Sequence, residues 1–261
     1  MKRNNQKKND FPDKSQTNVI YGISPVIEAI SAGNRSIDKI LVAEGKQHKR
    51  IDEIIKLARL NNIRFQSIPR KALSDFIDEN ANHQGILAFT AESNYTDADT
   101  LISEIIKKEN SLCVILDGIE DPHNLGAILR SVECVGADGV FIPERRAVGL
   151  TETVAKSSAG ASEHVKIARV TNLNRLIDEL KKHYVWVIGT SIDAKMNYTK
   201  WDYKQKTAIV VGSEAKGISR LTAEKCDVLV NIPMCGKIES LNVSVAAGVV
   251  LFEALRQRTQ E

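Results

Sequence analysis

The carboxyl-terminal part of the chain repeats one pattern, a short apolar run followed by a longer helical or irregular stretch, and this repetition restricts the fold more than any other feature. The runs are rich in β-branched residues and read LCVILD, GVFIP, HVKIARV, VWVIGTSI, TAIVVGS and VLVNIPM. Strands joined by long crossovers pair in parallel, because the chain must return along the sheet before the next strand begins. The sequence therefore predicts an α/β domain with a mostly parallel sheet, preceded by a helix over residues 101–108.

The region before it, residues 18–91, also alternates between strands and helices and predicts a second, smaller α/β unit. Strands are expected at IDKILVA, IRFQSI and GILAFTA, with an amphipathic helix between the first two. The stretch SPVIEAISAG predicts a helix with Ser24 as its N-cap, Pro25 at its first position and Gly33 as its stop.

Two polar segments flank the smaller unit. The segment ESNYTDADT, residues 92–100, lacks apolar periodicity and is the predicted linker to a larger domain over residues 101–261. Residues 1–17 carry five Lys or Arg and two Asp and are expected to form a disordered basic tail, commonly a solvated terminus and otherwise an arm that touches nucleic acid. Because the tail lacks the apolar centre of a signal peptide and no apolar run reaches about 18 residues, we expect a cytoplasmic protein without a membrane segment.

The formal net charge of +3 at pH 7 does not single out a polyanionic partner. Binding to RNA depends on neutralising particular phosphates, so it would rest on local clusters of basic side chains. Each such cluster is equally compatible with a solvated face. The candidates are Lys46, Lys49 and Arg50, and the pair Arg145 and Arg146.

The cysteines and histidines are too scattered to predict a metal site. No C-x-x-C pair occurs, and three of the four cysteines lie in or beside apolar runs, which suits small buried hydrophobic side chains in a reducing compartment. We therefore expect no disulfide, no zinc and no other metal. The residues concerned are Cys113, Cys134, Cys226 and Cys235, with His48, His83, His123, His164 and His183.

Parallel sheets place their ligands at the carboxyl ends of the strands, in the loops that follow. After the first strand of the larger domain the turn reads DGIEDPHNLG rather than G-x-G-x-x-G, which argues against a dinucleotide site. The chain also lacks G-x-x-x-x-G-K-[ST], so a P-loop is excluded. The pattern alone thus predicts a ligand site at the strand ends without naming the ligand.

The last strand and the last helix frame the most polar of these loops, MCGKIESLN. The strand is the β-branched run over residues 228–232, which Pro233 closes because proline has no donor for the sheet. The helix follows, with Asn242 or Ser244 near its N-cap. Its predicted buried face consists of Val245, Gly248, Val249, Phe252 and Leu255.

Three stretches together resemble, in order and in spacing, the three motifs of the SpoU branch of the SPOUT RNA methyltransferases, which transfer a methyl group from S-adenosylmethionine to a ribose 2′-hydroxyl. The stretches are LDGIEDPHNLGAILRSVECVGADGV (residues 116–140), IVVGSEAKGIS (residues 209–219) and IPMCGKIESLNVSVA (residues 232–246). The resemblance begins near Asn18, because the smaller unit resembles the substrate-binding domain of several such enzymes. It implies a trefoil knot in the larger domain and a homodimer formed through that domain.

The resemblance places S-adenosylmethionine against Gly212, Ile232 and Leu241, with Thr190 at the end of VWVIGT as a further contact. Apolar walls suit an adenine and a thioether-like tail, and a glycine lets the backbone approach closely. Glu214 follows Gly212 by two residues, so its carboxylate would lie near the sulfonium charge or orient the loop.

The resemblance assigns catalysis to Arg130, six residues after Asn124, and completes the site with Ser240 and Asn242. A ribose hydroxyl is protonated at neutral pH, so methyl transfer needs a base or a strong positioning field. Because a guanidinium normally stays protonated, Arg130 would either act as the base with help from a phosphate or bind that phosphate. Without the motif, Arg130 would be taken for a surface residue of its helix. The predicted core face of that helix is Leu125, Ile128, Leu129 and Val132.

The sequence thus predicts an S-adenosylmethionine-dependent RNA ribose 2′-O-methyltransferase. The stretches YGISPVIEAI and NHQGILA resemble those of the enzyme that methylates a guanosine in the peptidyl-transferase region of large-subunit ribosomal RNA, so ribosomal RNA is the first expected substrate. A transfer-RNA ribose methyltransferase is the nearest alternative, and a related antibiotic-resistance methyltransferase is another. From a different class, a non-catalytic RNA-binding assembly factor would keep the fold without the reaction.

Overall fold

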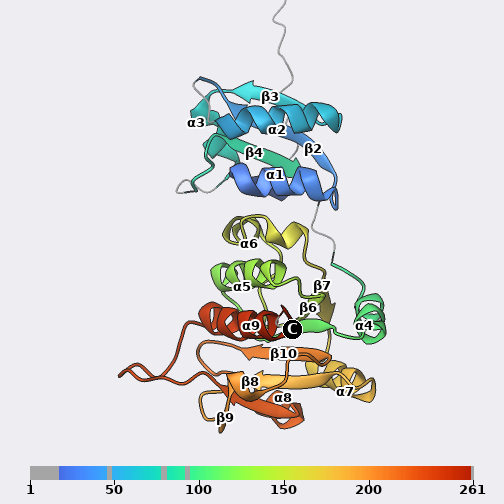
Figure 1. Ribbon diagram of the computed structural model, residues 1–261. Coiled ribbons are helices and arrows are strands. Elements are labelled where there is room, and N and C mark those ends of the chain that lie inside the picture. Colours follow the sequence, from blue (N-terminus) through green and yellow to red (C-terminus); the bar gives the residue numbers. More distant parts are fainter. Residues whose placement is uncertain (1–17, 46–48, 78–80, 92–94, 260–261) are drawn as a thin grey trace, which may run out of the picture. The chain divides into compact units, whose positions relative to one another are not determined.

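The computed structural model describes residues 18–45, 49–77, 81–91 and 95–259 (Figure 1). The chain divides into two compact units, Met1–Glu92 and Ser93–Glu261. Each unit has its own sheet, and each is described by itself below.

The amino-terminal unit is a four-stranded sheet in the order β1-β4-β2-β3. Strand β4 is antiparallel to both β1 and β2, whereas β2 and β3 are parallel and are joined by helix α2. The three strands predicted in this region are confirmed, and β1 is an additional one. The elements are β1 (Asn18–Tyr21), α1 (Ile23–Ala32), β2 (Ile37–Ala43), α2 (Lys49–Leu60), β3 (Arg64–Ile68), α3 (Arg70–Leu73), the 3₁₀ turn Ser74–Phe76 and β4 (Ile86–Thr90).

The predicted N-cap of α1 is wrong by two residues. The cap position is Gly22 rather than Ser24, so Pro25 occupies the third helical position instead of the first. A distant side chain replaces the expected local cap, because the Ile23 N–H donates to Oε1 of Gln84 at 2.9 Å. The predicted stop at Gly33 is confirmed, since this residue has φ 63 and takes the left-handed conformation that glycine adopts freely.

The carboxyl-terminal unit is built on a seven-stranded sheet in the order β7-β6-β5-β10-β8-β11-β9, and every neighbouring pair is parallel. This confirms the predicted parallel sheet and each of its predicted strands. Strand β9 was missed because it has only two residues. The strands are β5 (Leu112–Asp117), β6 (Gly139–Pro143), β7 (Ile167–Val170), β8 (Trp186–Thr190), β9 (Met196–Asn197), β10 (Thr207–Gly212) and β11 (Val228–Asn231).

Helices cover both faces of this sheet (Figure 1). Alternate residues of β5 point to opposite faces, so Val114 packs in one core with α5 and α9, and Ile115 packs in the other with α4 and α7. Helix α4 begins before the predicted residue 101, because Oδ1 of Asp97 accepts from the Thr100 N–H at 2.9 Å and caps it. The helices are α4 (Ala98–Lys107), α5 (Pro122–Cys134), α6 (Glu152–Ser157), α7 (Leu173–Lys182), α8 (Arg220–Lys225) and α9 (Val243–Thr259).

Helix α9 buries a different face from the one predicted. Val245 and Phe252 of the predicted stripe are 50% and 49% exposed. The helix is apolar on nearly every side until its last turns, so apolar spacing could not decide which side faces the sheet. The predicted core face of α5, by contrast, is confirmed. The apolar residues that α9 buries are Val243, Ala247, Val250, Leu251 and Ala254.

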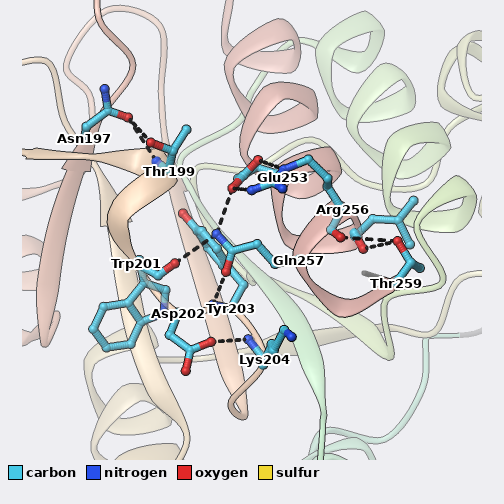
Figure 2. A network of polar contacts seen from close by, with 11 residues as sticks. Asn197, Thr199, Trp201, Asp202, Tyr203, Lys204, Glu253, Arg256, Gln257 and Thr259 are labelled. Carbon is cyan, nitrogen blue, oxygen red and sulfur yellow. Dashed lines mark hydrogen bonds and ion pairs between the residues drawn. The ribbon is translucent and has the colours of Figure 1, made fainter. Parts of the chain in front are cut away.

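The carboxyl end of α9 is held by a polar network on the segment that leads into β10 (Figure 2). The side chain of Gln257 accepts from the Tyr203 N–H at 3.0 Å and donates to the Trp201 carbonyl at 3.1 Å and to Glu253 at 2.7 Å. The guanidinium of Arg258 donates to four backbone carbonyls, those of Asn110, Ser111, Tyr203 and Gln205. Burial lowers the pKa of Arg258. These contacts fix the helix whose amino end enters the candidate site.

The cysteines are less buried than expected. Cys113 is buried and Cys226 is partly buried, whereas Cys134 and Cys235 are exposed, and all four are free thiols. Burial raises the pKa of Cys226 to about 12. Within the described ranges no three His, Cys, Asp or Glu side chains are grouped to hold a metal ion. Over the same ranges, no helix is both long enough and apolar enough to cross a membrane.

Candidate active site

A first cavity of about 470 Å³ lies at the carboxyl ends of β8, β10 and β11, the edge at which a parallel sheet is expected to bind a ligand. Its size falls within the range of about 300–1,000 Å³ that is usual for small-molecule sites. It brings together the four predicted cofactor residues and two predicted catalytic residues. They are Thr190, Gly212, Ile232, Leu241, Glu214 and Ser240.

The loop after β10 forms one wall of this cavity and turns back at once. The Ser213 N–H donates to the Gly217 carbonyl at 3.0 Å, and the Gly217 N–H donates to the Ser213 carbonyl at 2.8 Å. A Cβ atom on Gly212 would lie 2.0 Å from the carbonyl carbon of Gly217. The sequence analysis explained Gly212 by the close approach of a ligand. The close approach of the Gly217 backbone already requires a glycine at this position.

The remaining walls of the first cavity are largely apolar. Val211 and Val230 are buried, and Ile232 and Leu241 follow the end of β11. The hydroxyl of Thr190 donates to the Val210 carbonyl at 3.2 Å, so this side chain ties β8 to β10 at the cavity. Apolar walls with a few convergent polar groups are typical of a site for a small molecule that carries a ring.

Asn242 is the centre of the polar part of the site. Its Nδ2 donates to Oδ1 of Asn124 at 3.0 Å and also to Oε1 of Glu214. Its Oδ1 accepts from the Ser244 N–H at 2.9 Å and from the Val245 N–H at 3.4 Å, which makes Asn242 the N-cap of α9 as predicted. One side chain thus joins α5, the loop after β10 and the start of α9.

A second cavity of about 460 Å³ lies beyond the Ser213–Gly217 loop, at the ends of β5 and β6. The loop and Val243 line both cavities, so Glu214 borders each of them. Asn124 lines only the second cavity. Four acidic and two basic residues are among those that line it: Asp117, Glu120, Asp121 and Glu214, with Arg146 and Lys216.

Two predicted catalytic residues are not joined to the Asn242 cluster. Arg130 is exposed on α5 and lines neither cavity, and its side chain has no hydrogen bond or ion pair among the residues that the structure describes. Six residues separate it from Asn124, a rotation of about 240° around the helix. Ser240 lines the first cavity, and within the described part of the chain its side chain has no hydrogen-bond partner.

The sequence analysis missed several residues that line the two cavities. Ser191 and Asp193 follow β8, and Met234 follows β11, all at the strand ends that the topology rule indicates. Asp117 closes β5, where its carboxylate accepts from the Ser219 N–H at 2.8 Å. Their place after apolar strands was the available signal, and their side-chain types alone were too ordinary to single them out.

Comparison with known proteins agrees with this fold. The model of the SpoU rRNA methylase family matches residues 111–252, and a model described as RNA 2′-O ribose methyltransferase substrate binding matches residues 19–96. The fold and the family matches are those of an RNA methyltransferase. The chain belongs to the SpoU rRNA methylase family, and its amino-terminal unit belongs with the substrate-binding domains of RNA 2′-O-ribose methyltransferases.

Full-length relatives share this organisation. A Staphylococcus aureus (strain COL) protein, named for the TrmH family of tRNA/rRNA methyltransferases, is 48% identical over 241 residues, which is 92% of this chain and 96% of the relative. YacO of Bacillus subtilis (strain 168), named for the same family, is 43% identical over 244 residues, or 93% and 97% of the two chains.

Solved structures extend the likeness to the fold. A crystal structure of an RNA 2′-O ribose methyltransferase has a TM-score of 0.78 at 26% identity and covers 94% of this chain and 90% of its own. The SpoU methyltransferase AviRb from Streptomyces viridochromogenes, solved with AdoMet, has a TM-score of 0.77 at 24% identity over 94% and 92% of the chains. These comparisons confirm the predicted family and the SPOUT-type α/β fold.

Proposed function

We propose that this protein transfers a methyl group from S-adenosylmethionine to the ribose 2′-hydroxyl of a guanosine in 23S ribosomal RNA. The observation that carries the proposal is the Asn124–Asn242–Glu214 cluster, which joins the rims of two adjacent cavities at the strand ends. A transfer reaction needs two ligands to meet, and this cluster marks the boundary at which they would do so.

The first cavity fits the proposed cofactor. When bound, S-adenosylmethionine supplies an electrophilic methyl group on a positively charged sulfonium. Val230, Ile232 and Leu241 provide apolar wall for an adenine, and the backbone around Gly212 provides donors and acceptors. The carboxylate of Glu214 borders the same cavity and would favour a nearby positive charge.

The residues of the cluster would orient the acceptor hydroxyl. Asn242 donates its two amide hydrogens to Asn124 and Glu214, so it fixes the positions of these two acceptors relative to each other. Ser240 lies two residues before Asn242 and lines the first cavity, and its hydroxyl is available for the substrate. Arg130 would bind the adjacent phosphate, or accept the ribose proton while that phosphate assists.

The protein would work as a homodimer through its carboxyl-terminal unit. Val245 and Phe252 leave an apolar stripe of α9 exposed, and Gly248 of α9 faces Ser131 of α5. Arg130 is the residue before Ser131 on α5. A second copy seated on the stripe would cover the apolar surface and bring Arg130 toward an Asn242 cluster, which Arg130 does not reach in its own chain.

Other parts of the proposal are supported by membership of the family rather than by the site. The amino-terminal unit would select the RNA, in keeping with its match to substrate-binding domains. The predicted linker, residues 92–100, would join the two units, and its last three residues form the start of α4. The trefoil knot and a place in the cytoplasm remain predictions. The predicted basic tail, residues 1–17, lies outside the described residues, and so does Lys46 of the basic cluster near the start of α2.

The nearest alternative substrate is transfer RNA, because the names of both full-length relatives give tRNA and rRNA together. Mapping 2′-O-methyl groups in ribosomal and transfer RNA from cells with and without the protein separates the two. Loss of one guanosine methylation in 23S ribosomal RNA is the expected result, and loss in transfer RNA alone would reassign the substrate. Calorimetry with S-adenosylmethionine tests whether the protein is instead a non-catalytic assembly factor. Such a factor would show no heat of cofactor binding, and cells without it would lose no methylation.

A further inference from the structure

We propose that the second cavity holds the target nucleotide and that Arg146 binds a phosphate beside it. This inference rests on the proposed function, because it names the part of the RNA that the second cavity receives. The cavity is about 460 Å³, and it shares the Ser213–Gly217 loop and Val243 with the first cavity. Two ligands placed in these cavities would meet at Glu214, next to Asn242.

The charges of the cavity leave few positions for a phosphate. Asp117, Glu120 and Asp121 line it and would repel an anion. Two of these carboxylates already accept backbone N–H groups, Asp117 from Ser219 at 2.8 Å and Asp121 from His123 at 2.8 Å. An RNA phosphate is therefore expected beside the basic residues Arg146 and Lys216, while the carboxylates accept from amino groups of the base.

Arg146 is free to take this role. It is exposed, and no other described residue forms a hydrogen bond or an ion pair with its side chain. Its backbone has φ 58, a conformation that a residue with a side chain rarely adopts. Nearby, the Val148 N–H donates to the Ile119 carbonyl at 2.9 Å, which holds the loop of Arg146 against the loop that follows β5.

Arg145 provides a matched control, because it is the neighbouring exposed arginine and does not line the cavity. The measurement is methyl transfer from labelled S-adenosylmethionine to unmodified 23S ribosomal RNA made in vitro, over a range of KCl concentrations. We expect Arg146→Ala to raise the KM for RNA about tenfold, with kcat within about twofold, and to reduce the slope of log KM against log salt by about 0.7–0.9. Arg145→Ala should leave the KM and the slope near those of the unmodified protein.

Two further variants separate the effect of the Arg146 side chain from that of its backbone conformation. Arg146→Lys keeps the charge and should restore part of the RNA affinity. Arg146→Gly suits the positive φ and should fold at least as stably, yet it should lose affinity as Arg146→Ala does. Equal KM values for Arg145→Ala and Arg146→Ala would overturn the inference, and so would an Arg146→Gly protein with unchanged KM.

The outcomes also distinguish this inference from the proposed function. If the unmodified protein methylates the RNA and the Arg146 variants match it, only the nucleotide pocket is wrong. If the unmodified protein transfers no methyl group to ribosomal or transfer RNA, the proposed function fails. In that case, filter binding of the same RNA still tests whether Arg146 contacts a phosphate, because Arg146→Ala should then bind the RNA more weakly than Arg145→Ala.

Discussion

At the scale of single residues, Asn242 combines a structural and a functional task in one amide group. Its oxygen caps α9, and its nitrogen donates to Asn124 and Glu214. Aspartate at this position would keep the cap but would lose both donated hydrogen bonds and add a charge beside Glu214. The two tasks can therefore be separated by the choice of substitution.

We expect Asn242→Asp to keep the N-cap of α9 and to lower kcat for methyl transfer by at least about 100-fold, as loss of a positioned donor commonly does. Asn242→Ala should lose the same activity and also about 1 kcal/mol of unfolding free energy. The matched control is Asn172→Ala, which removes the Asn172 side chain that caps α7 by accepting from Asn174 and Arg175. That variant should lose similar stability and keep its kcat; a normal kcat for Asn242→Asp would exclude Asn242 from the reaction.

Gly212 is the residue with the least room for a side chain in this site. A Cβ there would overlap the backbone of Gly217 and Ile218, at 2.0 Å and 2.1 Å. We expect Gly212→Ala to shift the Ser213–Gly217 loop, to cost about 1–3 kcal/mol of unfolding free energy, and to weaken the binding of S-adenosylmethionine. Gly236→Ala is the control, since its nearest neighbouring atom would lie 4.0 Å away. Thermal unfolding and calorimetry measure both effects, and unchanged cofactor affinity in Gly212→Ala would contradict this description of the loop.

At the scale of elements, the predictable features were those with a strong local pattern. The buried strands β5 and β10 follow from unbroken apolar runs, and the buried face of α5 follows from its apolar spacing. The orientation of α9 was not predictable, because Val245 and Phe252 are as apolar as the residues it buries. The Asn242 cluster joins residues more than a hundred positions apart, so only the family motifs brought Asn124 to attention.

The acidic residue that α9 buries gives a test at this scale. Glu253 accepts from Arg256 at 2.8 and 2.7 Å and from Gln257 at 2.7 Å, and hydrogen bonding to Arg256 lowers the pKa of the Glu253 carboxyl (Figure 2). A carboxyl whose pKa is lower in the folded protein adds stability above its unfolded pKa of about 4.3. That stability is lost as the pH falls through the lower, folded value.

We expect Glu253→Gln to reduce the unfolding free energy by about 1–2 kcal/mol at pH 7, with the difference shrinking as the pH falls below about 4. The control is Glu224→Gln, which breaks an exposed pair with Arg220 and should change stability by less than about 0.5 kcal/mol. Urea unfolding at pH 7 and at successively lower pH measures both proteins. A Glu253→Gln deficit that is independent of pH would show that packing, rather than charge, stabilises this end of α9.

At the scale of the whole molecule, the exposed stripe of α9 predicts how two copies associate. A charge at Phe252 would have to be buried in the proposed interface, so Phe252→Glu should convert the dimer to a monomer. Leu221→Glu is the control, because Leu221 is 55% exposed on α8, away from that stripe. Light scattering coupled to gel filtration reads out the mass. A dimeric Phe252→Glu protein would place the interface elsewhere.

The position of Arg130 leads to the most discriminating test of the assembly. Arg130 lies on the exposed side of α5, apart from its own Asn242 cluster, so we expect it to serve the site of the partner subunit. Arg130→Ala and Asn242→Asp should each be inactive as homodimers. A mixed dimer of the two would then hold one site with both defects and one site with neither.

Co-expression of the two variants with different affinity tags, followed by purification through both tags, isolates this mixed dimer. One intact site of two predicts about half of the normal methyl transfer per dimer, whereas the two parent homodimers stay near background. If Arg130 instead acts on the site of its own chain, every site in the mixed dimer carries one defect and no activity returns. Recovery in the mixed dimer would therefore show that the reaction needs side chains from both subunits, and its absence would return Arg130 to its own site.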